Sequence, residues 1–275
     1  MLKQRIITAL VLLIVLALAL TVAKPWGFPV LALLLVGAVI GEWLLLLGFG
    51  RIVVTIAALG TMLVLWMAAG THDAARIDLA AWIAAASIWF VLALGLIAAR
   101  RFPTVTQFRF FHACAALVLP AACWLALVAA YRQGLVFMLS ILAVVWAADV
   151  AAYFAGRAFG KRKLAPSISP GKTWAGAVGG LVAAVGLAAA SLAVPQLDGS
   201  FFARLNQRQS FLVVLLVVAL LVVLSVVGDL FESHLKRQRG VKDSGRTLPG
   251  HGGVFDRMDA LLPVVPVALL ISRVL

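Results

Sequence analysis

The feature that most constrains this chain is a succession of long apolar runs. Each is close to the roughly 20 residues that a helix needs to cross the hydrocarbon core of a bilayer. Apolar residues are continuous in these runs instead of alternating at every second position, which predicts helices and not the strands of a membrane barrel. We therefore expect an all-α, polytopic integral membrane protein with about nine transmembrane helices. The runs cover about residues 6–23, 28–49, 53–70, 79–99, 111–130, 135–155, 174–195, 210–231 and 258–274.

Composition agrees with a membrane protein. The chain is 64% hydrophobic and only 12% charged, whereas ordinary soluble domains are roughly 45–50% apolar. A net charge of +13 would suggest nucleic acid as a partner of a soluble protein. Here Lys and Arg flank apolar spans, a position that is explained by membrane topology and by attraction to anionic phosphates. We therefore expect the lipid bilayer and no nucleic acid as partners. The basic start and first apolar run resemble a secretory signal but are too long for one, which indicates a retained helix.

The distribution of Lys and Arg predicts the orientation. In a nine-span arrangement, most of the 23 Lys and Arg residues lie on the side of the amino terminus. The positive-inside rule then places the amino terminus and the basic loops at 156–172 and 232–257 in the cytoplasm, with the protein in the cell's inner membrane. We expect amino-terminal transmembrane helices over 1–145 and a catalytic region over 146–275. The cations left on the opposite side are Lys24, Arg76, Arg132, Arg204, Arg208 and Arg273.

Half of the ten acidic residues fall between residues 229 and 259. Asp229 and Glu232 end a strongly apolar span, where carboxylates are costly and usually face a partner or a polar cavity. If this helix continues past the membrane surface, Asp229, Glu232, Ser233 and Lys236 form one polar stripe, at positions i, i+3, i+4 and i+7. Such a stripe suits a divalent cation next to a phosphate.

A glycine-rich segment follows this stripe and leads into the final helix. Its glycines permit close backbone approach to a phosphate, and Asp256, Arg257 and Asp259 stand where the helix begins. Hard oxygen ligands and many cations, without a Cys/His cluster, point to magnesium and a polyphosphate. The lone His251 could be a ligand, although a loop histidine is more often structural.

A second basic segment contains Gly-Lys-Thr at 171–173, but a phosphate-binding P-loop needs glycine where Pro166 stands. We therefore reject a Walker-type nucleotidase. Asp149 shares a helical face with Tyr153 and Gly156, and its role is open between catalysis and an interhelical hydrogen bond. Glu42 in the second span is similarly ambiguous.

The two basic segments resemble the phosphatidate cytidylyltransferases, also called CDP-diacylglycerol synthases. The resemblance is specific over about 145–275, and Ala175 departs from the acidic or amide residue that the family often has after Trp174. It rests on Asp149-x-x-Ala152-Tyr153, Ser169-Pro170-x-Lys172-Thr173-Trp174-x-Gly176, Ser233-x-Leu235-Lys236-Arg237, Lys242-Asp243-x-Gly245 and Leu248-Pro249-x-His251-Gly252-Gly253-Val254-x-Asp256-Arg257-Met258-Asp259.

The resemblance implies an enzyme that joins CTP to phosphatidic acid, with magnesium, giving CDP-diacylglycerol and pyrophosphate. It also implies a homodimer with a polar site open to the cytoplasm, and a monovalent cation as a further occupant is left open. The implied metal ligands are Asp229 and Asp256, with Asp259 as a third. The implied catalytic residues are Asp229, Asp256, Lys242 and Arg257, and the implied substrate-binding residues are Ser169, Lys172, Thr173, Ser233, Lys236, Arg237, His251 and Arg5.

Two alternatives remain at this stage. A CTP-dependent lipid kinase, or another enzyme of polyprenyl phosphates, would need the same magnesium and phosphate groups. A secondary transporter would also have many helices, but its polar residues should lie near the membrane midplane in broken helices. In this chain the charged residues gather at one predicted membrane edge, which favours an enzyme.

Overall fold

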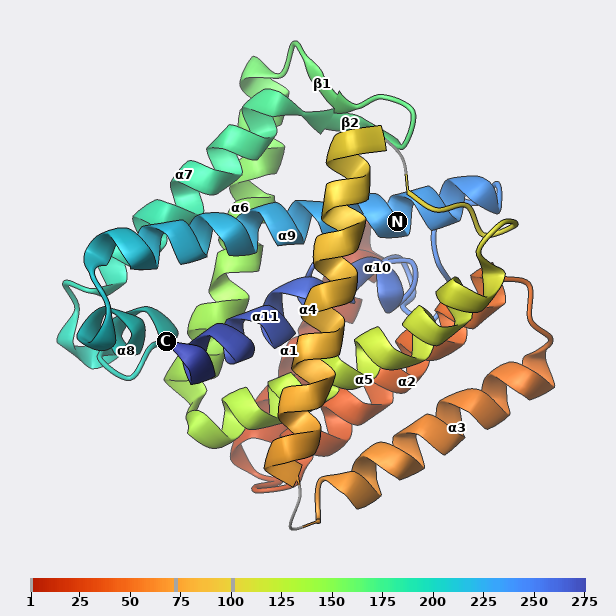
Figure 1. Cartoon of the computed structure of the whole chain (residues 1–275), viewed down its shortest axis with the longest axis horizontal. Coiled ribbons are helices and arrows are strands. Elements are labelled where there is room, and N and C mark those ends of the chain that lie inside the picture. The colour runs from red at the N-terminus through yellow and green to blue at the C-terminus, as the bar shows by residue number, and fades with distance from the viewer. Residues whose placement is uncertain (1, 72–73, 100–101) are drawn as a thin grey trace.

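The computed structural model describes residues 2–71, 74–99 and 102–275, and it is mainly helical (Figure 1). The all-α class expected from the sequence is confirmed. A small two-stranded antiparallel hairpin between α6 and α7 is the one sheet in the described residues. The elements are α1 Leu2–Thr21, α2 Gly27–Leu46, α3 Arg51–Ala68, α4 Ala74–Ala99, α5 Arg109–Gln133, α6 Leu135–Phe159, β1 Lys163–Ala165, β2 Ser169–Thr173, α7 Trp174–Ser191, η1 Pro195–Leu197, α8 Phe201–Arg208, α9 Phe211–Gln238, α10 Phe255–Met258 and α11 Leu261–Val274.

Seven helices in the described part of the chain are long and apolar enough to cross a membrane: α2 to α7 and α9. The protein is therefore a multi-pass membrane protein, as predicted. The other two predicted spans are shorter helices. The apolar part of α1 covers Leu10–Thr21, and α11 has 14 residues, which rise only about 21 Å against a hydrocarbon core of about 30 Å. The exact number of spans stays a prediction.

The last predicted span differs because its first turn is broken. Met258 ends the short helix α10, and α11 begins only at Leu261. Gly228 of α9 explains how this corner packs, since a Cβ there would lie 2.4 Å from the carbonyl oxygen of Asp259. The missing side chain lets the α10–α11 corner press directly against α9, beside Asp229.

The two ends of the helix bundle are chemically different. At one end, called here the site end, lie α10, the hairpin and the carboxyl-terminal ends of α2, α6 and α9 (Figure 1). The backbone N–H of Val105 donates to the side-chain oxygen of Gln238 at 2.7 Å, which ties the α4–α5 connection to the end of α9. At the other end, called the opposite end, α8 lies near the carboxyl terminus of α11 (Figure 1).

A cluster of aromatic side chains packs below the site end. Trp43 of α2 stacks on Phe255 of α10, with ring centroids 4.9 Å apart and an interplanar angle of 15°. Phe231 of α9 meets Trp43, Trp89 and Phe102 edge to face. Edge-to-face and offset-stacked aromatic pairs are the favoured arrangements. Five segments, namely α2, α4, the α4–α5 connection, α9 and α10, are thereby packed together beneath the polar residues.

Helices α6 and α7 pack closely because small residues line their interface. A Cβ on Gly176 would lie 2.8 Å from the Ala152 carbonyl oxygen, and one on Gly180 would lie 2.7 Å from that of Ala148. Small residues four apart allow such backbone approach between membrane helices. This packing sets the width of the cavity described below. The predicted division of the chain between residues 145 and 146 falls inside α6.

Candidate functional site

The polar stripe predicted on the ninth helix is present, because α9 continues without a break to Gln238. Ser233 Oγ donates to Asp229 Oδ1 at 3.4 Å, and Lys236 Nζ lies 2.5 Å from Glu232 Oε2. Residues four apart on a helix face are neighbours, which accounts for both contacts. The stripe faces two different partners: Asp229 meets the hairpin, and Lys236 meets α10.

Lys236 joins α9 to α10. Its ammonium lies 2.7 Å from Asp256 Oδ1 as well as against Glu232, so one cation bridges two carboxylates. The side chains are 13% exposed for Lys236, 9% for Asp256 and 1% for Glu232. Charges this well shielded from water interact strongly. Removing one of the three side chains would therefore leave a buried charge without an opposite charge beside it. The sequence predicts a substrate-binding role for Lys236, and the structure shows that Glu232 and Asp256 fix the position of its ammonium group.

Asp256 also organises the glycine-rich loop. Its Oδ2 accepts from the backbone N–H of Ser244 at 3.0 Å, from the hydroxyl of Ser244 at 3.1 Å and from the backbone N–H of Gly253 at 2.7 Å. Burial by itself raises the pKa of Asp256, but hydrogen bonds with Glu232, Lys236 and Gly253 outweigh it and lower this pKa to about 2. The carboxylate is therefore ionised at any physiological pH and fully occupied by donors from the protein.

Glu42 of α2 is the second anchor of this loop, and the sequence left its role open. Its carboxylate accepts from the hydroxyl of Ser244 at 2.8 Å and from that of Thr247. It also accepts from the backbone N–H groups of Val254 at 3.0 Å and Phe255 at 2.9 Å. Four donors satisfy a buried carboxylate that would otherwise be costly at this depth. Glu42 is therefore a positioning residue for the loop.

Two loop glycines are required by Glu42. A Cβ on Gly253 would lie 2.2 Å from Glu42 Oε2 and 2.1 Å from Ser244 Oγ, and a Cβ on Gly245 would lie 2.5 Å from Glu42 Oε1. Gly250 and Gly252 instead have positive φ angles of 77° and 83°, a backbone region that favours glycine. The glycines that the sequence assigned to phosphate approach thus also let the loop close around two carboxylates.

Asp229 faces a cavity of about 550 Å³ bounded by α6, α7, α9 and the hairpin. Lys172 Nζ of β2 lies 2.5 Å from Asp229 Oδ2, and the two side chains are 24% and 31% exposed. Asp149, Tyr153 and Gly156 line the same cavity, as expected from their shared helical face. Lys172 also lies within electrostatic range of Asp149. The cavity therefore holds a lysine between two carboxylates.

The hairpin brings the Gly-Lys-Thr segment to this cavity without forming a P-loop. Ser169 begins β2, and Thr173 ends it as the N-cap of α7, where its hydroxyl accepts from the Gly176 N–H at 3.1 Å. Ser169, Lys172 and Thr173 all line the cavity. A Cβ on Gly160 would lie 2.8 Å from Thr173 Oγ1, so α6 and the hairpin approach closely here. The rejection of a Walker motif agrees with this geometry.

The remaining predicted residues lie around the loop. Arg257 donates from Nε and Nη2 to the carbonyl oxygen of His251, at 3.2 and 2.7 Å. The Nδ1 atom of His251 is buried and has no hydrogen-bond partner in the described structure. Arg237 and Lys242 are exposed. The side chain of Arg5 lies outside the described residues, although Thr8, one turn further along α1, donates to the Pro249 carbonyl oxygen at 2.8 Å.

The predicted metal ligands do not converge on one point. In the residues that the structure describes, no group of three or more His, Cys, Asp or Glu side chains could hold a metal ion. Asp229 is paired with Lys172, and Asp256 with Lys236. Asp259 lies within electrostatic range of Asp229, and its Oδ1 accepts from the Ala260 N–H at 2.8 Å. A cation at this site would need ligands from water or substrate in addition to the protein.

Sequence reasoning missed Ser244 and Thr247, and it left Glu42 and Glu232 without a committed role. Glu42 and Glu232 could have been selected as site residues because each is an acidic residue within an apolar span. Nothing in the sequence indicated that Glu42 would meet Ser244, which is 202 positions away.

Comparisons with known proteins identify the family of this chain. A family model described as "Cytidylyltransferase family" matches residues 3–275. The phosphatidate cytidylyltransferase of Pseudomonas aeruginosa is 38% identical over 276 residues, which cover 97% of this chain and 95% of the relative. That of Haemophilus influenzae is 38% identical over 291 residues, covering 97% and 96%. That of Bacillus subtilis is 44% identical over 135 residues, about half of each chain. The resemblance seen in the motifs is confirmed: the chain belongs to the cytidylyltransferase family.

Proposed function

We propose that this protein is a phosphatidate cytidylyltransferase, which joins CTP to phosphatidic acid and releases pyrophosphate. Family membership and two relatives of that name, matched over nearly the full length, support the proposal. The structural observation that carries it is the Lys172–Asp229 pair in a cavity of about 550 Å³. This cavity combines cations, carboxylates and hydroxyls at one end of membrane-spanning helices, as a reaction between a nucleotide and a lipid requires.

The reaction consists of one substitution at phosphorus. A phosphate oxygen of phosphatidic acid attacks the α-phosphorus of CTP, and a new P–O bond forms while the bond to the bridging oxygen of the β-phosphate breaks. The electron pair of that bond leaves with pyrophosphate. Positioning two polyanions in line and stabilising the charge that develops are the main requirements of such a transfer. The lysines and arginines of this site can meet both.

Lys172 is the cation best placed to receive phosphate, since it lines the cavity together with Ser169 and Thr173. Lys236 is held between two carboxylates and orders the loop before any substrate binds. Arg237 and Lys242 are exposed and follow Lys236 closely in the sequence, and in this proposal they add positive charge for the phosphates. In this proposal Ser233 and Arg257 act near the phosphates. His251 orients Arg257 through its carbonyl oxygen.

Magnesium suits the donor atoms of this cavity. It prefers oxygen ligands and keeps several waters or phosphate oxygens. Asp229 is 31% exposed beside the cavity, and Asp149 lines the same space. The proposed ligands are therefore Asp229 first and Asp259 near it, whereas Asp256 would have to exchange Lys236 for the metal. When bound, magnesium would offset charge on the triphosphate. A monovalent cation as an additional occupant stays open.

The proposal includes the surroundings of the enzyme. The acyl chains of phosphatidic acid can remain in lipid, because Tyr153, Phe154, Trp174 and Val178 expose apolar surface on α6 and α7. The charge distribution supports an inner-membrane location, with the amino terminus and the site end facing the cytoplasm. We further propose a homodimer, as the family resemblance implies.

The test is an assay of purified protein with phosphatidic acid, magnesium and CTP labelled at either the α- or the γ-phosphate. Label from the α-position should enter a lipid product, and label from the γ-position should leave as pyrophosphate. Transfer of γ-label into lipid would instead identify a CTP-dependent kinase. Lys172→Met should reduce incorporation at least about 100-fold, since one stabilising donor is commonly worth that much. Lys161→Met, which changes an exposed lysine before the hairpin, is the matched control and should retain activity.

A further inference from the structure

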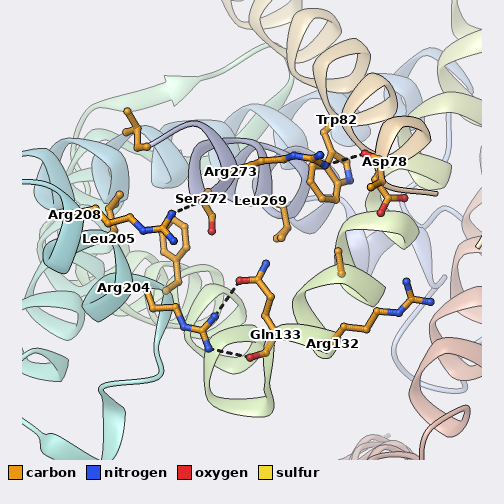
Figure 2. Close-up of a pocket in the computed structure, with 14 residues that line it drawn as sticks. Asp78, Trp82, Arg132, Gln133, Arg204, Leu205, Arg208, Leu269, Ser272 and Arg273 are labelled. Carbon is orange, nitrogen blue, oxygen red and sulfur yellow. Dashed lines mark hydrogen bonds between the residues drawn. The ribbon is translucent and has the colours of Figure 1, made fainter. Parts of the chain in front are cut away.

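A second cavity lies at the opposite end of the bundle. It has a volume of about 480 Å³ and is formed by the beginning of α4, the end of α5, α8 and the end of α11 (Figure 2). None of its lining residues belongs to the candidate site. Its most conspicuous members are Arg132, Arg204, Arg208 and Arg273, and it is called here the arginine pocket.

The number of arginines in this pocket is unexpected for its location. The positive-inside rule disfavours Lys and Arg on the side of the membrane opposite the basic loops. Of the six cations that the sequence places on that side, only Lys24 and Arg76 are not among the lining residues. Asp78 is the single acidic side chain that lines the pocket. The pocket therefore has an excess of positive charge that topology does not explain.

Neutral groups hold the arginines in place. Arg204 donates to the side-chain oxygen and the backbone carbonyl oxygen of Gln133 at 3.2 and 3.0 Å. Arg208 donates to the Ser272 carbonyl oxygen at 3.4 Å, and Arg273 to that of Ala75 at 2.9 Å (Figure 2). No salt bridge joins these arginines to a carboxylate in the described residues. Asp78 lies within electrostatic range of Arg132 and Arg273, and the Arg204 guanidinium lies over the Phe137 ring. Each guanidinium has five N–H donors, which is more than these hydrogen bonds use.

The sequence builds α8 to present two of these arginines. Ser200 caps the helix by accepting from the Ala203 N–H at 3.1 Å. Phe201 and Leu205 are buried, and each also lines part of the pocket wall. Arg204 and Arg208 are four residues apart and therefore lie on one helix face. The pocket thus combines an apolar wall with a cationic rim.

Trp82 forms part of the apolar wall of the pocket. Its side chain lines the pocket and is only 4% exposed. Its indole N–H is buried and has no hydrogen-bond partner in the described part of the structure, as is also the case for Trp43 and Trp89 outside the pocket. Its ring therefore offers apolar surface to a ligand in the pocket.

We propose that the arginine pocket binds the phosphate group of an anionic phospholipid from the leaflet opposite the candidate site. Guanidinium groups bind phosphate oxygens in a bidentate manner. The apolar residues Trp82, Phe201, Leu205 and Leu269 beside them suit the glycerol and upper acyl region of a lipid better than a free ion. This inference is independent of the proposed catalytic function.

The test compares lipids bound to the purified, full-length protein by native mass spectrometry. Wild-type protein should bind phosphatidylglycerol in preference to phosphatidylcholine. Arg204→Gln combined with Arg208→Gln should weaken phosphatidylglycerol binding at least about tenfold, because loss of a charge-assisted phosphate contact exceeds 1.4 kcal/mol. The matched control combines Lys24→Gln with Arg76→Gln, which removes two charges from the same side of the membrane and should leave binding unchanged.

Three results would overturn the proposal: equal binding of the two lipids by wild-type protein, unchanged binding by the Arg204/Arg208 variant, or an equal loss in the control. Inorganic phosphate that displaced the lipid at micromolar concentration would show that the ligand is a free anion. Arg208→Gln alone provides a milder variant, since the one hydrogen bond of this side chain within the described residues goes to a backbone carbonyl oxygen. A melting temperature equal to that of the wild type in the same detergent checks that each variant is folded.

Discussion

Glu42 and Ser244 are separated by 202 positions in the chain and joined by a hydrogen bond of 2.8 Å. The bond links the second helix to the glycine-rich loop at the other end of the sequence. Ser244 Oγ also lies 3.1 Å from Asp256 Oδ2, so its single hydroxyl proton is shared between the two carboxylates that hold the loop. The amino-terminal helices therefore take part in shaping the site.

Replacing Glu42 should impair positioning more than folding. Glu42→Ala leaves two hydroxyls and two backbone N–H groups without their acceptor, and we expect about a 100-fold loss of kcat/KM, because small misplacements of a site cost about this much. Glu42→Gln keeps one strong acceptor and should lose less. Limited proteolysis of the loop, measured beside activity, should reveal faster cleavage in Glu42→Ala. If Glu42→Ala kept full activity although its loop was cleaved faster, the positioning role of Glu42 would be contradicted.

Lys236 should be essential for stability as well as for activity. Lys236→Met leaves Glu232 and Asp256 facing each other without a cation, which should destabilise the protein by about 3–5 kcal/mol. Lys236→Arg keeps the charge and should recover much of the thermal stability. The melting temperature in a defined detergent measures both effects. A melting temperature of Lys236→Met equal to that of Lys161→Met would argue against the bridge.

Asp256 should make stability depend on pH in the acidic range. Its pKa is about 2 in the folded protein, below the ordinary value of 3.8, so its stabilisation is fully present above about pH 4 and is lost as the pH falls through 2. The difference between these two pKa values corresponds to about 2 kcal/mol in the free energy of unfolding. Melting temperatures between pH 5 and pH 2.5 should fall less steeply for Asp256→Asn than for wild type. If the melting temperatures of wild type and Asp256→Asn fell equally with pH, Asp256 would not be the source of the pH dependence.

The tight loop packing predicts a sharp contrast between glycines. Gly253→Ala places a Cβ 2.1 Å from Ser244 Oγ and 2.2 Å from Glu42 Oε2, so the loop must shift away from Ser244 and Glu42. We expect a loss of activity of at least about 100-fold. Gly60→Ala, in α3, meets no atom within 4 Å and should be neutral or slightly stabilising. Comparable activity of the two purified variants would be incompatible with the packing described.

Metal dependence provides the remaining prediction. Chelation should abolish turnover, and added magnesium should restore it in the wild-type enzyme. Asp229→Asn should raise the magnesium concentration needed for half-maximal rate, because it replaces a charged ligand with a neutral one. Asp198→Asn, at an exposed position far along the chain, serves as the control. An unchanged magnesium requirement in Asp229→Asn would remove this residue from the proposed ligand set.

Much of the site could be predicted from sequence because its residues are local. Asp229, Ser233 and Lys236 share a face of one helix, and helical periodicity alone places them together. The family motifs added Lys172 and Asp256. The sequence could not show that Lys172 pairs with Asp229 and Lys236 with Asp256, because these contacts depend on how the hairpin and α10 pack against α9.

The sequence by itself determined that this chain is a helical membrane protein whose family motifs and clustered charges lie towards the carboxyl terminus, since apolar runs and clustered charges are properties of neighbouring residues. Only the tertiary structure decided the partners of the buried carboxylates. Glu42 reaches Ser244 and Thr247, and four arginines from three helices meet around one pocket. Helix packing creates these long-range contacts, and they cannot be predicted from the residue pattern along a single segment.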